Sequence, residues 1–436
     1  MYRGEGKFKT SARHWTETTK KVRGMLKDQY AGAHVTDKPV VWSMLAMINE
    51  LYMAMDVYPL YPENYAGLCA TKRVADPFLE RAQADGFSDV CCTYAQTGLG
   101  YAAMCQDTGQ IPDIAPDGGM AKPAMLIGSS LVCDTRFKWF QSFARYLDVP
   151  YYAFDMPIPR SMRSDTAMGY LNYTVEQMRG LIDFMERVLG RKMDWDKLDE
   201  IVTRTQKTYE CWYEAFTMSA SAVPCPMPAE DTLTNFAPAF FMTGSEAALD
   251  FYQELLDEVK GKVERKEGVV PEEKYRLIWG SGLPPWHTMN VFNSVEERGA
   301  VFVYQCAYQP FAPMEIPGIT DPLMRMLIGR GLPASRRLAR DVPTTDEFSL
   351  IDLSSPAFFI EPFKADGIVI SMLRSCRGTS IGQTYLKRKI QEQTNVPVLI
   401  LETDICDVHA HSEADVAARF DAFFETLESR KKAGAS

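Results

Sequence analysis

Apolar segments alternate with amphipathic segments in both halves of this 436-residue chain, and the alternation predicts an α/β fold. The clearest unit spans residues 366–407, where an apolar run leads to Cys376, a turn of small residues opens a basic helix, and a second apolar run follows. Residues 125–154 repeat this order around Cys133. Strand, loop, helix and strand in this order form a parallel βαβ unit. We therefore predict two doubly wound, Rossmann- or flavodoxin-like parallel sheets that face each other across a cleft.

Pattern and composition divide the chain into four regions. Residues 1–38 are polar and basic and are expected to form an N-terminal helical arm. Residues 39–160 form the first α/β domain and residues 161–268 a helical connector, in which apolar residues recur every three or four positions. Residues 269–436 form the second α/β domain with its C-terminal helix.

Strands and helices follow from the period of the apolar residues. Strands are expected at residues 39–44, 57–61, 125–128, 151–154, 300–304, 367–373 and 396–401, and another starts at Arg276. Helices are expected at residues 45–55, 62–84 with a break near Pro77, 136–147, 174–189, 195–217, 246–262, 290–297, 322–338 and 413–431.

The net charge, the length of the apolar runs and the number of cysteines narrow the class of protein. A net charge of −10 argues against nucleic acid as the main partner. Every apolar run is shorter than the roughly 20 residues that span a bilayer, and the first residues lack the apolar core of a signal peptide. We expect a cytoplasmic protein with no membrane partner. Ten cysteines in such a chain are too sparse for a disulfide scaffold, so metal ligands, catalytic thiols and buried thiols remain.

Three cysteines share one setting. Cys92, Cys133 and Cys376 each lie in a loop after a strand or before a helix, and two facing α/β domains would bring such loops together. Three thiolates can hold an iron–sulfur cluster and leave one iron open, although the alternative for any single cysteine is a buried small apolar side chain. The remaining cysteines fit the role of a buried apolar side chain better: Cys69, Cys91, Cys105, Cys211, Cys225, Cys306 and Cys406. Among them, Cys91 is the hardest to exclude as a ligand because it is next to Cys92.

Several segments resemble the 2-hydroxyacyl-CoA dehydratase and benzoyl-CoA reductase subunit family. They are CTYAQ from Cys92, CDT from Cys133, CRGTS from Cys376, and LKRKIQEQTNVPVLILETDICD followed by HSEADVAARFDAFFE. The resemblance runs from about Val40 to Thr426. The stretch WSMLAMINELYMAMDVYPLYPENYAG looks closest to the larger cluster-bearing subunit of ATP-dependent (class I) benzoyl-CoA reductase.

The resemblance implies a [4Fe–4S] cluster with an open iron site, bound by Cys92, Cys133 and Cys376. It also implies a homologous second cluster-bearing subunit, ATP-hydrolysing electron-activating subunits, ferredoxin upstream and an acyl-CoA substrate. Neither GxxxxGK[ST] nor GxGxxG occurs in this chain, so ATP is expected only on a partner. Thr93 and Gly378 depart from the Cys-Ser-Tyr-like and Cys-Arg-Pro-like wording of the family.

The implied function is the catalytic iron–sulfur subunit of a benzoyl-CoA reductase, which adds low-potential electrons one at a time to give a cyclohexadiene-carbonyl-CoA. The alternatives are a 2-hydroxyacyl-CoA dehydratase subunit, which removes water through a ketyl radical, and a non-catalytic electron-relay subunit. A benzoyl-CoA reductase is an oxidoreductase, and a 2-hydroxyacyl-CoA dehydratase is a lyase.

Two residues are candidates for proton transfer. His287 follows a strand end and can face the cleft, or it can be a loop histidine bonded to the backbone. Glu50 lies on an otherwise apolar helix, where an acid needs a partner. Aromatic residues can line a flat pocket or simply fill the core: Trp42, Tyr94, Tyr101 and Trp286.

Overall fold

Two four-stranded sheets form the two halves of the molecule, and the computed structural model describes residues 13–45, 48–131, 133–156, 164–330 and 356–434. The strands are β1 (Val40–Ser43), β2 (Tyr58–Leu60), β3 (Met125–Ser129), β4 (Tyr151–Phe154), β5 (Tyr275–Ser281), β6 (Ala300–Gln305), β7 (Gly367–Leu373) and β8 (Val398–Thr403). All pairings are parallel, in the orders β2-β1-β3-β4 and β6-β5-β7-β8. The predicted fold class is confirmed, and both sheets share one strand order.

Helices cover both faces of the first sheet. They are α3 (Asn49–Ala54), α4 (Pro62–Thr71), α5 (Asp76–Ala84), α6 (Thr93–Thr108) and α7 (Thr135–Leu147). Trp42 and Leu126 pack toward α4 to α7, whereas Val41 and Ile127 pack toward α3 and the long helix that follows β4. The predicted break near Pro77 is confirmed. Helices α5 and α6 pack closely, since a Cβ on Gly100 would lie 1.8 Å from the Phe78 carbonyl oxygen.

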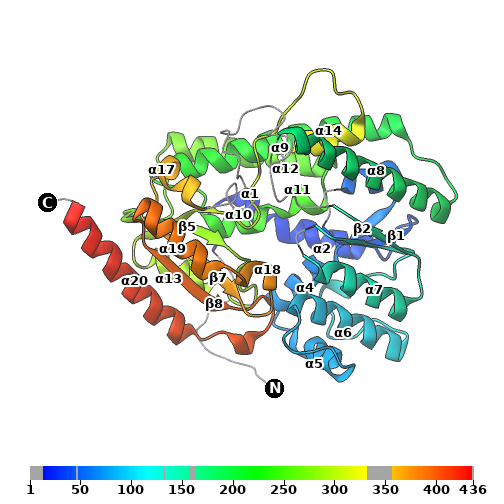
Figure 1. Cartoon of the computed structure of the whole chain (residues 1–436), viewed down its shortest axis with the longest axis horizontal. Coiled ribbons are helices and arrows are strands. Elements are labelled where there is room, and N and C mark those ends of the chain that lie inside the picture. The colour runs from blue at the N-terminus through cyan, green and yellow to red at the C-terminus, as the bar shows by residue number, and fades with distance from the viewer. Residues whose placement is uncertain (1–12, 46–47, 132, 157–163, 331–355, 435–436) are drawn as a thin grey trace.

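The middle of the chain is helical and lies across the top of both sheets in Figure 1. Its helices are α8 (Ser164–Leu189), α9 (Trp195–Ser221), α10 (Ala229–Asn235), α11 (Ala237–Phe241) and α12 (Glu246–Glu264). Asp194 caps α9 by accepting from the Lys197 amide at 2.9 Å. Helix α9 joins the halves because Ile201 packs with the first sheet and Phe216 with the second.

The arm and the second half complete the chain. The arm contains α1 (Glu17–Lys20) and α2 (Val22–Gly32), and the second half contains α13 (Asn290–Glu296), α17 (Ile360–Phe363), α18 (Arg377–Ser380), α19 (Gln383–Thr394) and α20 (Glu413–Gly434). Helix α14 (Pro322–Gly329) lies between α13 and α17 in the chain but packs in the core of the first half. Parts of two predicted helices, residues 46–47 and 331–338, lie outside the described residues. Within the described ranges, no helix has the length and apolar composition that a membrane crossing needs.

One core cluster connects the two halves. Leu373 at the end of β7 and Ile405 after β8 pack with Trp42 and Tyr94 of the first half. The carboxyl ends of the strands in both sheets therefore meet at a shared apolar core. In Figure 1, α18 lies at the end of the second half that faces the first half.

Candidate functional site: the cysteine junction

Cys92, Cys133 and Cys376 meet where the carboxyl ends of the two sheets approach each other; we call these three residues the cysteine junction. Cys92 immediately precedes α6, Cys133 lies between β3 and α7, and Cys376 lies between β7 and α18. Asp134 and Arg377, the residues that follow two of these cysteines, form an ion pair of 3.0 Å across the two halves. The loops after β3 and β7 are thus in direct contact.

The three thiols lie near enough to influence one another. Burial raises the pKa of Cys92 to about 12, and Cys376 and Cys133 add to the rise. Burial also raises the pKa of Cys133, with a further contribution from Cys376. Backbone N–H groups of Ala95 and Tyr94 point at the Cys92 sulfur and oppose its shift. Free Cys92 and Cys133 are therefore neutral thiols at pH 7, and a metal that binds their thiolates must displace protons.

A buried ion pair holds the Cys133 loop. Arg136, on the first turn of α7, donates two hydrogen bonds to the Glu63 carboxylate at 2.8 and 2.9 Å. The same guanidinium donates to the Leu131 carbonyl at 2.7 Å, within the loop that carries Cys133, and its charge opposes the rise in the pKa of that thiol. Neither Arg136 nor Glu63 was among the residues predicted from the sequence.

The cysteine junction supplies three thiols from three separate loops. Among the described residues, no group of three or more His, Cys, Asp or Glu side chains is arranged to hold one metal ion. A [4Fe–4S] cluster asks for a different geometry, because each cysteine binds its own iron and the sulfurs stand further apart. Three partly exposed thiols from separate loops, two of them approached by backbone N–H groups, match that donor set.

The remaining cysteines have other settings. Cys91 is exposed, and its carbonyl accepts a hydrogen bond of 2.6 Å from Gln96. Cys69, Cys225 and Cys406 are buried among apolar side chains. Burial raises the pKa of Cys306, which follows β6.

His287 is buried next to a second histidine. Its side chain is 1% exposed and its ring lies 5.6 Å from that of His411. Burial lowers the pKa of His287 to about 4, so the ring is neutral at pH 7. His411 lies 3.3 Å from Glu413, and hydrogen bonds from His411, Asn290 and Thr288 lower the pKa of that carboxyl to about 2.

Glu50 forms a buried ion pair with Arg330. Its carboxylate accepts a 2.6 Å hydrogen bond from Arg330, and the side chains are 0% and 2% exposed. Arg330 also lies over the ring of Tyr209, 5.4 Å from its centroid. The partner that an acid on an apolar helix requires is therefore present.

The predicted aromatic group divides into two places. Trp42 and Tyr101 belong to the core of the first half, where their polar atoms donate to the carbonyls of Ala121 and Met120. The Trp286 indole instead donates to the Tyr94 hydroxyl, two residues after Cys92. Tyr308 lies near Tyr94 and belongs to this second group. Burial raises the pKa of the Tyr308 hydroxyl, and the Cys376 thiol adds to the rise.

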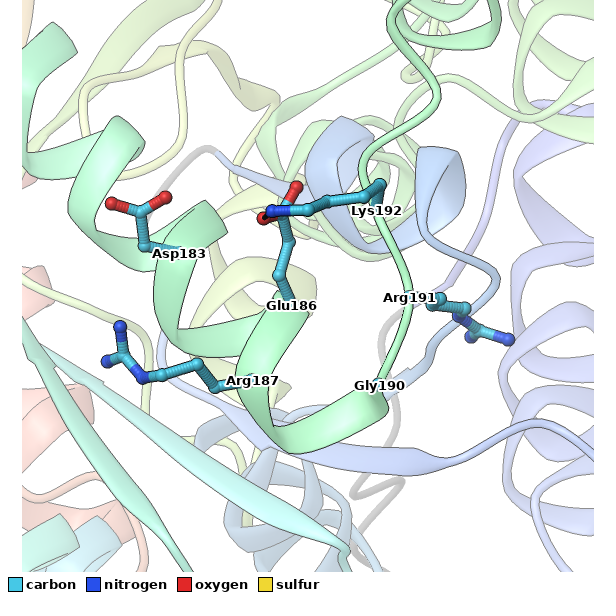
Figure 2. A pocket seen from close by; sticks show the side chains of 6 residues that line it. All are labelled: Asp183, Glu186, Arg187, Gly190, Arg191 and Lys192. Atoms are coloured by element: carbon cyan, nitrogen blue, oxygen red, sulfur yellow. Dashed lines mark hydrogen bonds and ion pairs between the residues drawn. The ribbon is translucent and has the colours of Figure 1, made fainter.

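A charged cavity of about 320 Å³ lies elsewhere, at the end of α8. Figure 2 shows its lining, in which Lys192 reaches Glu186 at 2.6 Å while Arg187 and Arg191 point in different directions. The cations do not converge on one point, and none of the residues predicted for the site lines this cavity. It offers no support for an anionic ligand.

Known proteins resemble the chain over most of its length. Residues 45–427 match the family described as 2-hydroxyglutaryl-CoA dehydratase, D-component. The chain is 25% identical to the (R)-2-hydroxyisocaproyl-CoA dehydratase alpha subunit of Clostridioides difficile, with 94% of this chain and 96% of that protein covered. It is 26% identical to a subunit of benzoyl-CoA reductase from Thauera aromatica (94% and 93% covered) and 24% identical to the alpha subunit of lactoyl-CoA dehydratase from Anaerotignum propionicum (90% and 92%). The chain belongs to the 2-hydroxyglutaryl-CoA dehydratase D-component family, in agreement with the resemblance of its motifs.

Proposed function

We propose that this chain is a catalytic subunit that holds a [4Fe–4S] cluster on Cys92, Cys133 and Cys376 and acts on an acyl-CoA thioester. The observation that carries the proposal is the meeting of these three thiols between two parallel sheets. When bound, the cluster would supply single low-potential electrons and an open iron for the thioester oxygen.

The chain's own residues would position and shield this chemistry. Arg136 and Glu63 fix the Cys133 loop, and Cys92 and Cys376 pack against the core that joins the halves. Burial raises the pKa of the Tyr308 hydroxyl, so it stays protonated and can donate a hydrogen bond beside Cys376. Proton transfer by His287 or Glu50 stays a prediction.

Benzoyl-CoA is our first choice of substrate. The relative from Thauera aromatica is named a benzoyl-CoA reductase subunit, and Tyr94, Trp286 and Tyr308 place aromatic surface beside the junction. The product would be a cyclohexadiene-carbonyl-CoA, with electrons from ATP-hydrolysing partner subunits supplied by ferredoxin. A homologous second cluster-bearing subunit would complete the pair.

A 2-hydroxyacyl-CoA dehydratase subunit is the second candidate, because the matched family and two of the relatives carry dehydratase names. Identities of 24% to 26% do not separate the two reactions. A third possibility, from another class, is an electron-relay subunit whose partner holds the substrate.

Iron analysis tests the ligands. Anaerobically prepared protein should hold about four irons and four sulfides per chain. Cys92→Ala, Cys133→Ala and Cys376→Ala, made singly, should each lose most of them, whereas Cys105→Ala should lose none. Cys91→Ala tests the neighbouring thiol. Full iron in each of the three single variants would contradict the ligand assignment.

A product assay tests the substrate. The chain is combined anaerobically with its partner subunit, activator, ATP and reductant, and then given benzoyl-CoA or a 2-hydroxyacyl-CoA. A diene product supports the reductase and an enoyl-CoA product supports the dehydratase. A crystal structure of the complex with acyl-CoA bound only to the partner would favour the relay subunit.

A further inference from the structure

Asp404 is a buried carboxylate at the carboxyl end of β8 that contacts both halves of the molecule. Its side chain is 2% exposed. Oδ1 accepts from the Thr93 hydroxyl at 2.7 Å, and Oδ2 accepts from the Ser375 amide at 3.1 Å. Thr93 follows Cys92 and Ser375 precedes Cys376, so one carboxylate joins the neighbours of two cysteines from opposite sheets.

Asp404, Thr93 and Ser375 are linked to one another by hydrogen bonds. Thr93 also uses its backbone amide, which donates to the Ser375 hydroxyl at 3.3 Å. The two hydroxyls lie 3.2 Å apart, and because the Thr93 proton points to Asp404, the Ser375 hydroxyl donates to Thr93. The amides of Cys406 and Asp407 donate to Oδ1, both at 3.2 Å, and hold the carboxylate in place. All four groups donate, so the buried carboxyl of Asp404 serves here only as an acceptor.

We propose that Asp404 is a positioning residue that sets the spacing of Cys92 and Cys376 between the two halves and adds a fixed negative charge next to Thr93 and Ser375, the residues adjacent to these cysteines. The proposal rests on the proposed function, since it concerns a cluster held by these two cysteines. Removing a group that orients a metal ligand typically lowers metal affinity about 10- to 100-fold. A nearby anion disfavours the reduced, more negative cluster and so lowers its potential.

Asp404→Asn is a sharp test because the side chain keeps its shape. An amide has one acceptor oxygen and one donor NH₂, and every orientation turns NH₂ toward a group that must itself donate. Thr93→Val removes the hydroxyl that bonds Asp404 and keeps the Thr93 backbone amide that bonds Ser375. Thr93→Ser restores a hydroxyl. Asp407→Asn is the matched control, because Asp407 caps the His409 amide at 2.8 Å, a role that asparagine also performs.

Each variant is reconstituted anaerobically with iron and sulfide, and iron content, the EPR spectrum of the reduced protein, the midpoint potential and iron loss to a chelator are measured. We expect Asp404→Asn to raise the midpoint potential, alter the EPR spectrum and weaken iron binding about 10-fold. Thr93→Val should alter the spectrum and weaken binding, while Thr93→Ser and Asp407→Asn should resemble the wild type.

The outcomes separate this proposal from the proposed function. Wild-type protein that takes up no cluster removes the proposed function, and this inference with it. A loaded wild type together with an Asp404→Asn protein of unchanged iron affinity, spectrum and potential overturns the positioning role alone. If Asp404→Asn does not fold, as judged by thermal unfolding before reconstitution, Thr93→Val decides, and its identity with the wild type would overturn the proposal.

Discussion

The two sheets share one strand order, but the residues at equivalent strand ends have different hydrogen-bond partners. Cys133 follows the third strand of the first sheet and Cys376 the third strand of the second. An aspartate follows the fourth strand in each, Asp155 and Asp404. Asp155 stays within its own half, accepting from the Ser130 and Tyr173 hydroxyls at 2.5 and 2.8 Å. Asp404 instead reaches Thr93 in the other half.

The loops that carry the cysteines are consequently fixed in different ways. The loop after β3 is held from within its own half, by Arg136 and Glu63. The loop after β7 is held through Asp404, whose partners belong to both halves. The contacts of the loop after β3 therefore fix Cys133 within the first half. The contacts of the loop after β7 make the spacing between Cys92 and Cys376 depend on how the two halves pack.

The largest expected effect concerns the internal support of the first half. Glu63→Ala leaves the buried Arg136 guanidinium without its counter-charge, in a pair whose side chains are only 14% and 8% exposed. Loss of one partner of a buried pair typically costs about 3–5 kcal/mol of unfolding free energy. Urea denaturation should therefore show a fall of about 3 kcal/mol. Glu176→Ala is the control, since Glu176 is 73% exposed and pairs with Arg179 at 3.6 Å; an equal fall in both variants would contradict a special role for the Glu63 pair.

The next effect is a pH dependence on the β8 side of the junction, where His287 lies near Asp404. Burial lowers the pKa of His287 from 6.5 to about 4, so the unfolded chain binds this proton more readily than the folded chain does. The stabilisation is present above pH 6.5 and lost as the pH falls toward about 4, and it amounts to about 3 kcal/mol. His287→Phe should flatten the dependence of unfolding free energy on pH in this range. His409→Phe, at a side chain 70% exposed, should not; equal slopes in wild type and His287→Phe would exclude His287 as the group responsible.

The fold and the cysteine loops were predictable because their signals are local. Short apolar runs between helical patterns identify the strands, and parallel strands place their carboxyl ends on one edge of each sheet, where Cys133 and Cys376 follow β3 and β7. Cys92 follows helix α5 instead, and the start of α6 brings it to the other two cysteines. Arg136 and Glu63 could not be found in this way, because the two side chains are 73 positions apart and nothing near Glu63 indicates that the first turn of α4 meets the first turn of α7. Asp404 was visible as the end of an apolar run, but its link to Thr93 depends on how two separate sheets pack.

A smaller effect compares the two strand-end aspartates directly. Asp404→Ala leaves the Ser375 amide and the Thr93 hydroxyl, both buried, without their acceptor, so we expect a loss of about 2 kcal/mol of unfolding free energy. Asp155→Ala loses bonds to hydroxyls that water can reach, since Asp155 and Tyr173 are partly or well exposed, and should lose about 1 kcal/mol or less. Denaturant titration of both variants measures the difference. Equal losses would remove the distinction between the two positions.

The smallest effect tests the direct contact between the equivalent cysteine loops. Asp134 and Arg377 form an ion pair of 3.0 Å, but their side chains are 77% and 74% exposed, so water and salt screen the attraction. Arg377→Ala should change the unfolding free energy by less than about 1 kcal/mol, and the change should vanish at high salt. A double-mutant cycle with Asp134→Ala isolates the coupling between the two side chains. A coupling as large as the loss expected for Glu63→Ala would mean that this exposed pair, and not Asp404, holds the two halves of the junction together.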